Sequence, residues 1–287
     1  MEILYLALAT FSRSGQQVAQ KEYAKRSKNS SFLYSLIAVL VAIIFYFLLP
    51  IFTGTGLYFN LNILIYSLLF ALTFIVSMVT GFLAIRTGSL SLSSLINQYS
   101  LIVPALYGIL FLAEPTKTTL FIGIALFVLS LLLINLKTGQ KGTKITLVWI
   151  IYAALSFISN GACATIINVQ QRDFNGMFKS EFMIIGLAIS ALVLIALSLI
   201  FERKDMIYNV KKAGVFGAIG GAFNGLNNFM IMLLAVMLPA SVAYPVMSAS
   251  ATVLTTLIAF IFYKEKMSIV QLIGIALGIG AIVMLNL

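Results

Sequence analysis

The chain has 287 residues, of which 61% are hydrophobic and only 9% are charged, and its mean hydropathy is +1.09. A soluble domain is about half apolar and about a quarter charged, so this composition excludes a water-soluble globular protein and predicts an integral membrane protein. The net charge of +10 would suggest nucleic-acid binding in a soluble protein, but here the basic residues gather at the ends of apolar runs, where they orient membrane helices.

Ten apolar runs, separated by turn or charge signals, are each long enough to cross a hydrocarbon core of about 30 Å as a helix. Helices are favoured over barrel strands, because the runs do not alternate between polar and apolar residues. The expected spans are 2–22, 31–50, 61–85, 89–113, 118–136, 145–170, 181–201, 212–236, 240–262 and 268–286. We therefore expect an all-α membrane protein with about ten transmembrane helices and no soluble domain.

Catalytic and metal-binding signals are missing from the sequence. The chain has no His and a single cysteine, Cys163, which excludes an intrachain disulfide, the common zinc sites and His-based catalysis. Neither a nucleotide-binding glycine loop nor a nucleophile–base pair appears. We expect no enzymatic activity, no cofactor and no bound metal.

The two halves of the chain share a pattern with a constant offset of 151 positions. The matched pairs are Glu114 with Glu265, Gly123 with Gly274, and Asn135 with Asn286. Each half holds five expected spans, and because five is odd the second half enters the membrane from the opposite side. This predicts two inverted five-helix repeats, at 1–138 and 144–287, a plan frequent among secondary transporters. The two glutamates close the fourth and ninth spans beside basic residues, and we expect them to fix loop geometry through local ion pairs.

With these features the chain resembles the drug/metabolite transporter superfamily, in particular its ten-helix members built from two EamA-type repeats. The resemblance covers the whole chain. It rests on the five-plus-five repeat, on Glu114 and Glu265, and on the glycines that follow them. It implies a substrate cavity lined by the first, third, fourth, sixth, eighth and ninth helices, and it leaves the substrate open.

Polar residues form stripes on the same six spans, whereas the second, fifth, seventh and tenth spans are apolar nearly all round. Polar side chains inside hydrocarbon are costly and usually face the bundle interior or a wet cavity. The candidate substrate-binding residues on these stripes are Arg13, Gln16, Gln20, Ser77, Asn97, Asn160, Asn224, Asn228, Tyr244 and Ser248. The alternative is that they bond neighbouring helices to one another.

Glycines on the eighth span allow two interpretations. The spacing of Gly217, Gly221 and Gly225 favours close helix packing. In the cavity hypothesis, Asn224 and Asn228 bind substrate, and the first two of these glycines give it room.

Arg13 is the strongest single signal. It lies near the middle of the first span, and no acidic residue lies at a comparable depth in any span. Its partner is then water, an amide oxygen or a ligand anion, unless the side chain snorkels to the nearer surface. Small multidrug members of the resembled superfamily carry an acidic residue in this helix, where the present chain has Phe11-Ser-Arg-Ser14. Arginine among amides instead favours a substrate with a carboxylate or phosphate.

The leading interpretation is secondary transport of a small polar, amino-acid-like metabolite by alternating access. A multidrug exporter, a channel and a non-transporting membrane scaffold are the alternatives. The expected partners are a small-molecule substrate and the lipid bilayer, not nucleic acid. Monomer and homodimer both stay open, as do import and export. The expected location is the cell membrane, crossed many times.

Basic residues also predict an orientation. The loops after the odd-numbered spans carry 14 of the 18 basic residues, and the opposite side carries only Lys117, Arg172 and Lys179. Because cytoplasmic loops are enriched in Lys and Arg, the first set of loops is expected in the cytoplasm and both termini outside.

Overall fold

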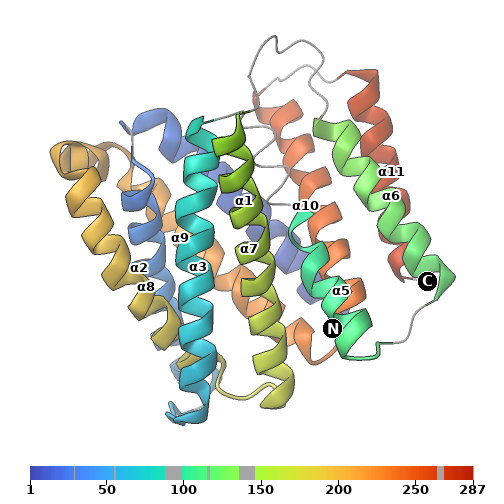
Figure 1. Cartoon of the computed structure of the whole chain (residues 1–287), viewed down its shortest axis with the longest axis horizontal. Coiled ribbons are helices and arrows are strands. Elements are labelled where there is room, and N and C mark those ends of the chain that lie inside the picture. The colour runs from blue at the N-terminus through green and yellow to red at the C-terminus, as the bar shows by residue number, and fades with distance from the viewer. Residues whose placement is uncertain are drawn as a thin grey trace.

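The computed structural model describes residues 1–28, 30–54, 56–87, 99–114, 117–135, 146–263 and 268–286, and every regular element within these ranges is helical. Figure 1 shows them gathered in one bundle. The helices are α1 (Glu2–Arg26), α2 (Phe32–Thr53), α3 (Asn62–Thr87), α5 (Ile102–Phe111), α6 (Thr118–Asn135), α7 (Leu147–Asp173), α8 (Lys179–Phe201), α9 (Met206–Ala235), α10 (Ala240–Tyr263) and α11 (Ile269–Asn286), with a short 3-10 turn η1 (Arg203–Asp205) before α9.

The expected spans coincide closely with these helices along most of the chain. The fourth span is represented by α5, because residues 88–98 lie outside the described part. The eighth span begins earlier than expected, at Met206 instead of 212, because the 3-10 turn leads directly into the helix and its basic first turns stay helical.

Five described helical stretches are long and apolar enough to cross a bilayer. They are Phe32–Phe52, Asn62–Gly81, Leu147–Asp173, Lys179–Phe201 and Arg203–Ala235. Large apolar side chains on them stay uncovered by protein, such as Ile44 at 56% and Leu192 at 70% exposure. So extensive an apolar surface is unfavourable in water but is favourable in contact with lipid. The prediction of an all-α membrane protein is therefore confirmed.

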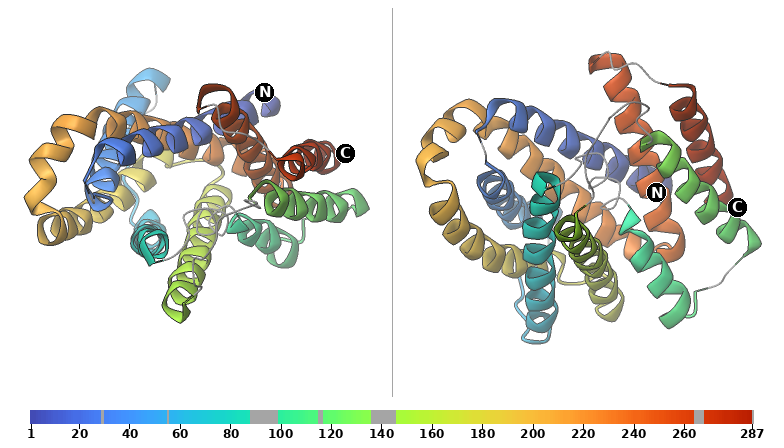
Figure 2. Two further views of the ribbon diagram at one scale, coloured as in Figure 1. Left: turned by 90° about the horizontal axis from the view of Figure 1, so that it is seen from above. Right: turned by 45° about the horizontal axis from the view of Figure 1, so that its top comes forward.

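The more polar helices contact one another in the middle of the bundle. α1 packs against α9 and α10, α7 contacts α3, α5 and α9, and α5 also contacts α10. The four apolar spans form two flanking pairs: α2 with α8, which also contact α9 and α3, and α6 with α11, beside α10. Figure 2 shows α6 and α11 side by side from two further directions. α1 is not among the five apolar stretches, and its Ser12 and Ser14 are fully buried by its neighbours.

Close packing of α9 on α2 depends on glycines. A Cβ at Gly217 would lie 3.0 Å from Ile37, and one at Gly221 would lie 2.5 Å from the carbonyl oxygen of Ala38. The packing interpretation of this spacing is thus confirmed. The hypothesis that these glycines leave room for a substrate is wrong, because α2 fills the space in front of them.

The two ends of the bundle differ in the hydrogen bonds that join a helix to a neighbouring loop. At one end, Asn209 of α9 exchanges hydrogen bonds with the backbone of Lys28, at 2.8 and 3.0 Å, after α1. At the other end, Glu181 of α8 accepts a bond from the backbone N–H of Tyr58, at 2.8 Å, before α3. Both chain termini lie at the lower right of Figure 1.

Candidate functional site

Arg13 lies at mid-depth in the bundle. The Ser14 hydroxyl donates to the carbonyl of Ala251, in the middle of α10, at 3.3 Å, and Gly15 lies against the ring of Phe223 in the middle of α9. Arg13 is only partly buried, and no hydrogen bond or ion pair joins its guanidinium to the part of the chain that the structure describes. The structure thus holds a cationic side chain in the middle of α1 with no protein counter-ion among the described residues.

Asn224 and Asn228 lie at about the same level, because Asn224 directly follows Phe223. Both are partly buried, and the Asn228 amide donates to the Asn224 side-chain oxygen at 3.2 Å. Within the described chain their hydrogen bond is to each other, not to a neighbouring helix. Their remaining amide atoms bond to no other described residue and can meet a ligand or water.

The other predicted residues are placed differently. Asn160 is partly buried on α7 and donates to the hydroxyl of Ser100, just before α5. Tyr244 and Ser248 are 2% and 1% exposed, and the Tyr244 hydroxyl donates to the carbonyl of Ala164 at 2.8 Å, so both lie in packed interfaces of α10. Gln16 and Ser77 are partly buried, Gln20 is exposed, and Asn97 lies outside the described residues. Their part in substrate binding stays a prediction.

A second polar site lies where α5 ends and α10 begins. The Glu114 side chain is only 4% exposed and accepts bonds from the backbone N–H groups of Ala240, at 2.8 Å, and Ser241, at 2.9 Å. It also accepts from the Ser241 hydroxyl at 2.7 Å and forms an ion pair with Arg172 at the end of α7. Gly108 makes this possible, because a Cβ there would lie 2.5 Å from a Glu114 carboxylate oxygen.

Glu114 fixes a connection, as its position in the sequence predicted, but the expected local ion pair is wrong, because its cation is the distant Arg172. Glu265, for which the same role was predicted, lies outside the described residues. The sequence did not identify its partners, the first turn of α10 and Arg172, which are distant along the chain. A carboxylate at a helix N-terminus is stabilised both by free backbone N–H groups and by the helix dipole.

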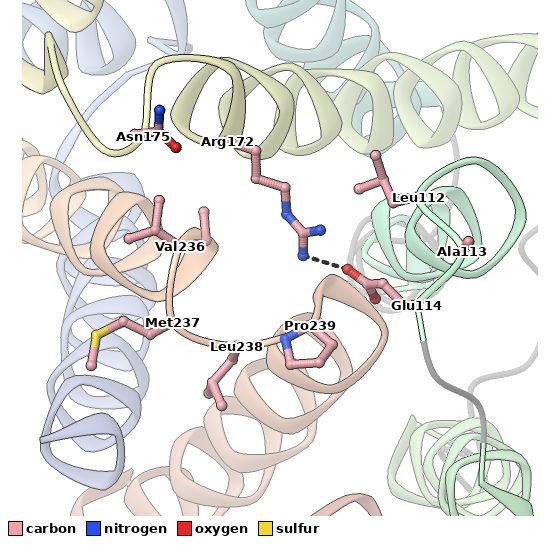
Figure 3. A pocket seen from close by; sticks show the side chains of 10 residues that line it. Leu112, Ala113, Glu114, Arg172, Asn175, Val236, Met237, Leu238 and Pro239 are labelled. Carbon is pink, nitrogen blue, oxygen red and sulfur yellow. Dashed lines mark hydrogen bonds and ion pairs between the residues drawn. The ribbon is translucent and has the colours of Figure 1, made fainter.

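A cavity of about 400 Å³ opens beside this ion pair (Figure 3). It is lined by Leu112, Ala113, Glu114, Arg172, Asn175, Ala235, Val236, Met237, Leu238 and Pro239. Figure 3 shows the Arg172 side chain reaching across from α7 to the Glu114 carboxylate. The lining thus combines apolar side chains with one acid–base pair and the amide of Asn175.

Buried polar atoms without a partner continue along α7 from this cavity. They include Nε of Arg172, both side-chain amide atoms of Asn168 and Oε1 of Gln171. Asn168 is 2% exposed and lies one turn before Arg172, beside the Tyr244 hydroxyl. Sequence reasoning overlooked Asn168 and Gln171, because polar residues near the end of a span are ordinary. Such buried, unsatisfied groups normally meet water or a ligand.

Residues 147–287 match the family model described as the EamA-like transporter family. This half of the chain belongs to the EamA-like transporter family. The long apolar helices make the chain a multi-pass membrane protein, and the match likens its second half to EamA-like transporters.

Two further likenesses accompany the EamA-like match. The uncharacterized membrane protein YvaE of Bacillus subtilis (strain 168) is 38% identical over 65 residues, 23% of this chain and 55% of that protein, so the match spans about half of YvaE. A solved crystal structure of another protein superposes with a TM-score of 0.78 at 14% identity and covers 99% of this chain and 95% of the other. At that identity the likeness shows the shared fold alone.

Proposed function

We propose that this EamA-like chain is a secondary transporter that moves a small metabolite bearing a carboxylate or phosphate across the cell membrane by alternating access. The observation that carries the proposal is Arg13, a mid-depth cation without a protein partner among the described residues. Burying an arginine at the centre of a bilayer costs from about 2.5 to more than 10 kcal/mol, and such residues normally serve a substrate or ion.

The neighbourhood of Arg13 favours an anion that carries further polar groups. A guanidinium presents its donors in a planar fork, which grips a carboxylate or phosphate through two parallel hydrogen bonds. Asn224 and Asn228, at about the same depth, offer amide donors and acceptors for other polar groups of the substrate. A cationic drug would instead need an acidic group at this depth, and α1 carries none in its middle.

Alternating access is supported by the way in which the two halves interlock. α1 packs on α9 as α7 packs on α3, and α2 contacts α9 as α8 contacts α3. Each of these contacts therefore has an equivalent in which every helix is replaced by the corresponding helix of the other half. This pattern supports two inverted repeats, at 1–138 and 144–287, that rock against each other around a site at the midplane.

The test is uptake of labelled compounds into proteoliposomes that contain the purified protein. Amino acids, organic acids, phosphate esters, nucleosides, sugars and cationic drugs would be scanned, with empty liposomes as the control. We expect saturable uptake of a compound with a carboxylate or phosphate, inhibited by unlabelled compounds of the same class. Saturable uptake confined to cationic drugs would contradict the proposal, and flux without saturation would indicate a channel.

A further inference from the structure

We propose that the cavity beside Glu114 is an anion-binding vestibule, in which Arg172 exchanges the Glu114 carboxylate for the anionic group of the substrate. This inference rests on the proposed function and adds a second, peripheral site to it. Arg172 would take the substrate at the end of the bundle, and Arg13 would take it at mid-depth.

The two partners of the ion pair are unequally held. Besides Arg172, Glu114 accepts bonds from two backbone N–H groups and one hydroxyl at the start of α10. It therefore stays compensated when Arg172 leaves. Arg172 has no comparable set of additional partners, since its Nε atom is buried without a hydrogen bond. A guanidinium released from Glu114 thus needs another anion, whereas the carboxylate does not need another cation.

The exposed fractions of the two side chains differ in the same direction. The Arg172 side chain is 28% exposed and the Glu114 side chain only 4%. Both side chains line the cavity, but a solute there meets more of Arg172, because the Glu114 carboxylate is held against the start of α10. The cavity volume of about 400 Å³ is within the range of small-molecule sites, roughly 300–1,000 Å³. A small carboxylate or phosphate compound would fit there with its anionic group on Arg172.

The exchange would also weaken a link between helices. Arg172 at the end of α7 is tied through Glu114 to both the end of α5 and the start of α10. When an anion takes Arg172, α7 is released from this junction, while Glu114 still holds α5 to α10. The buried amide of Asn168, one turn before Arg172 on α7, offers a further polar contact. Anion binding and opening of this end are thereby coupled.

The experiment measures protection of a thiol in the cavity and requires no transport. Val236, which lines the cavity and is 47% exposed, is changed to cysteine in a Cys163→Ser background. The purified protein in detergent reacts with neutral N-ethylmaleimide in sodium phosphate, sodium acetate or sodium chloride at equal ionic strength. We expect phosphate or acetate to slow the labelling relative to chloride.

Three variants of this protein give the inference its specificity. Arg172→Gln should raise the half-protecting anion concentration about tenfold or more, as expected for loss of a charge-assisted bond. Glu114→Gln, which removes the competing carboxylate, should lower it. Lys179→Gln removes a nearby cation that does not line the cavity and should leave it nearly unchanged.

Equal protection in the parent and in Arg172→Gln, or no protection in any variant, would overturn the vestibule. Protection by phosphatidylglycerol in the micelles but not by phosphate would assign Arg172 to a lipid headgroup and would overturn it as well. Either result leaves the uptake experiment and the role of Arg13 untouched, so the two proposals fail separately.

Discussion

Two buried carboxylates cap helices at opposite ends of the bundle, and they differ in the partners that surround them. Glu202, after α8, accepts bonds from the backbone N–H groups of Ser31, Phe32 and Leu33 at 2.7–2.9 Å and from the Ser30 hydroxyl at 3.3 Å. All four of these donors are neutral. Glu114, after α5, has three neutral donors and the cation Arg172, with a cavity beside it.

The difference separates a fixed end from an exchangeable one. Glu202 joins α8 to α2, two apolar helices on the flank, through bonds from backbone and hydroxyl donors of the chain itself. Glu114 joins α5 to α10 and, through a partly exposed arginine, to α7, three helices whose contacts surround the polar interior. A cap made only of backbone bonds stabilises the fold, whereas a cap with an accessible counter-ion can also respond to a ligand.

The largest expected effect is a difference in cysteine labelling, because the two ends of the bundle are predicted to lie on opposite sides of the membrane. In a Cys163→Ser background, Val236→Cys reports the Glu114 end and Lys204→Cys the Glu202 end; both positions are exposed. The count of basic residues predicts that an impermeant maleimide labels the first cysteine in intact cells and labels the second only after the cells are opened. The reverse pattern would place the exchangeable end in the cytoplasm.

Removal of the fixed cap should cost most stability. Glu202→Ala leaves three backbone N–H groups at the start of α2 without their acceptor, so the free energy of unfolding should fall by about 2–4 kcal/mol. Denaturant unfolding in detergent would measure this. Glu22→Ala is the control, because it removes two ion pairs with the exposed Lys25 and Arg26, each worth about 0–1 kcal/mol. Equal stabilities of the two variants would refute the structural role of Glu202.

The exchangeable cap should be sensitive to the space that Gly108 provides. Gly108→Ala places a Cβ against the Glu114 carboxylate and should cost about 1–3 kcal/mol. In a Glu114→Ala background the same change should cost much less, because the clash has gone. Gly280→Ala, with nothing within 4 Å of the new Cβ, is the matched control. Additive losses in the double variant would show that Gly108 acts independently of Glu114.

The smallest effect on stability is expected for Arg172→Gln. Glu114 keeps three donors in this variant, so the free energy of unfolding should fall by less than about 1 kcal/mol, as for partly exposed ion pairs. A loss as large as that of Glu202→Ala would mean that both ends are equally fixed, and the distinction between them would disappear.

The sequence predicted the helices well because a membrane span is a local property. Long apolar runs bounded by charges specify a helix without knowledge of its neighbours, and the ends of α3, α8 and α10 lie within two residues of expectation. The start of α9 was placed too late, because lysines at 211 and 212 resemble a boundary although the helix continues through them.

Only part of the candidate site could be predicted from the sequence. The mid-depth position of Arg13 followed from its place in the span, and the bond from Ser14 to the middle of α10 agrees with that depth. The pairing of Glu114 with Arg172 depends on which helix ends meet, and no local pattern encodes that. Of the two interpretations given for the glycines of α9, packing is confirmed and the cavity role is wrong, because a helical wheel shows which residues share a face but not which helix lies opposite.

The central claim is that Arg13 recognises the anionic group of the substrate, and the most direct test compares uptake by wild type, Arg13→Lys and Arg13→Gln in proteoliposomes at matched protein levels. We predict that Arg13→Lys is slower than wild type, because lysine keeps the charge but lacks the planar fork, and that Arg13→Gln is nearly inactive. Arg26→Gln, which removes an exposed arginine paired with Glu22 at the end of the same helix, should transport normally. Uptake by Arg13→Gln at the wild-type rate and affinity would contradict the claim, and with it the case for a carboxylate- or phosphate-bearing substrate.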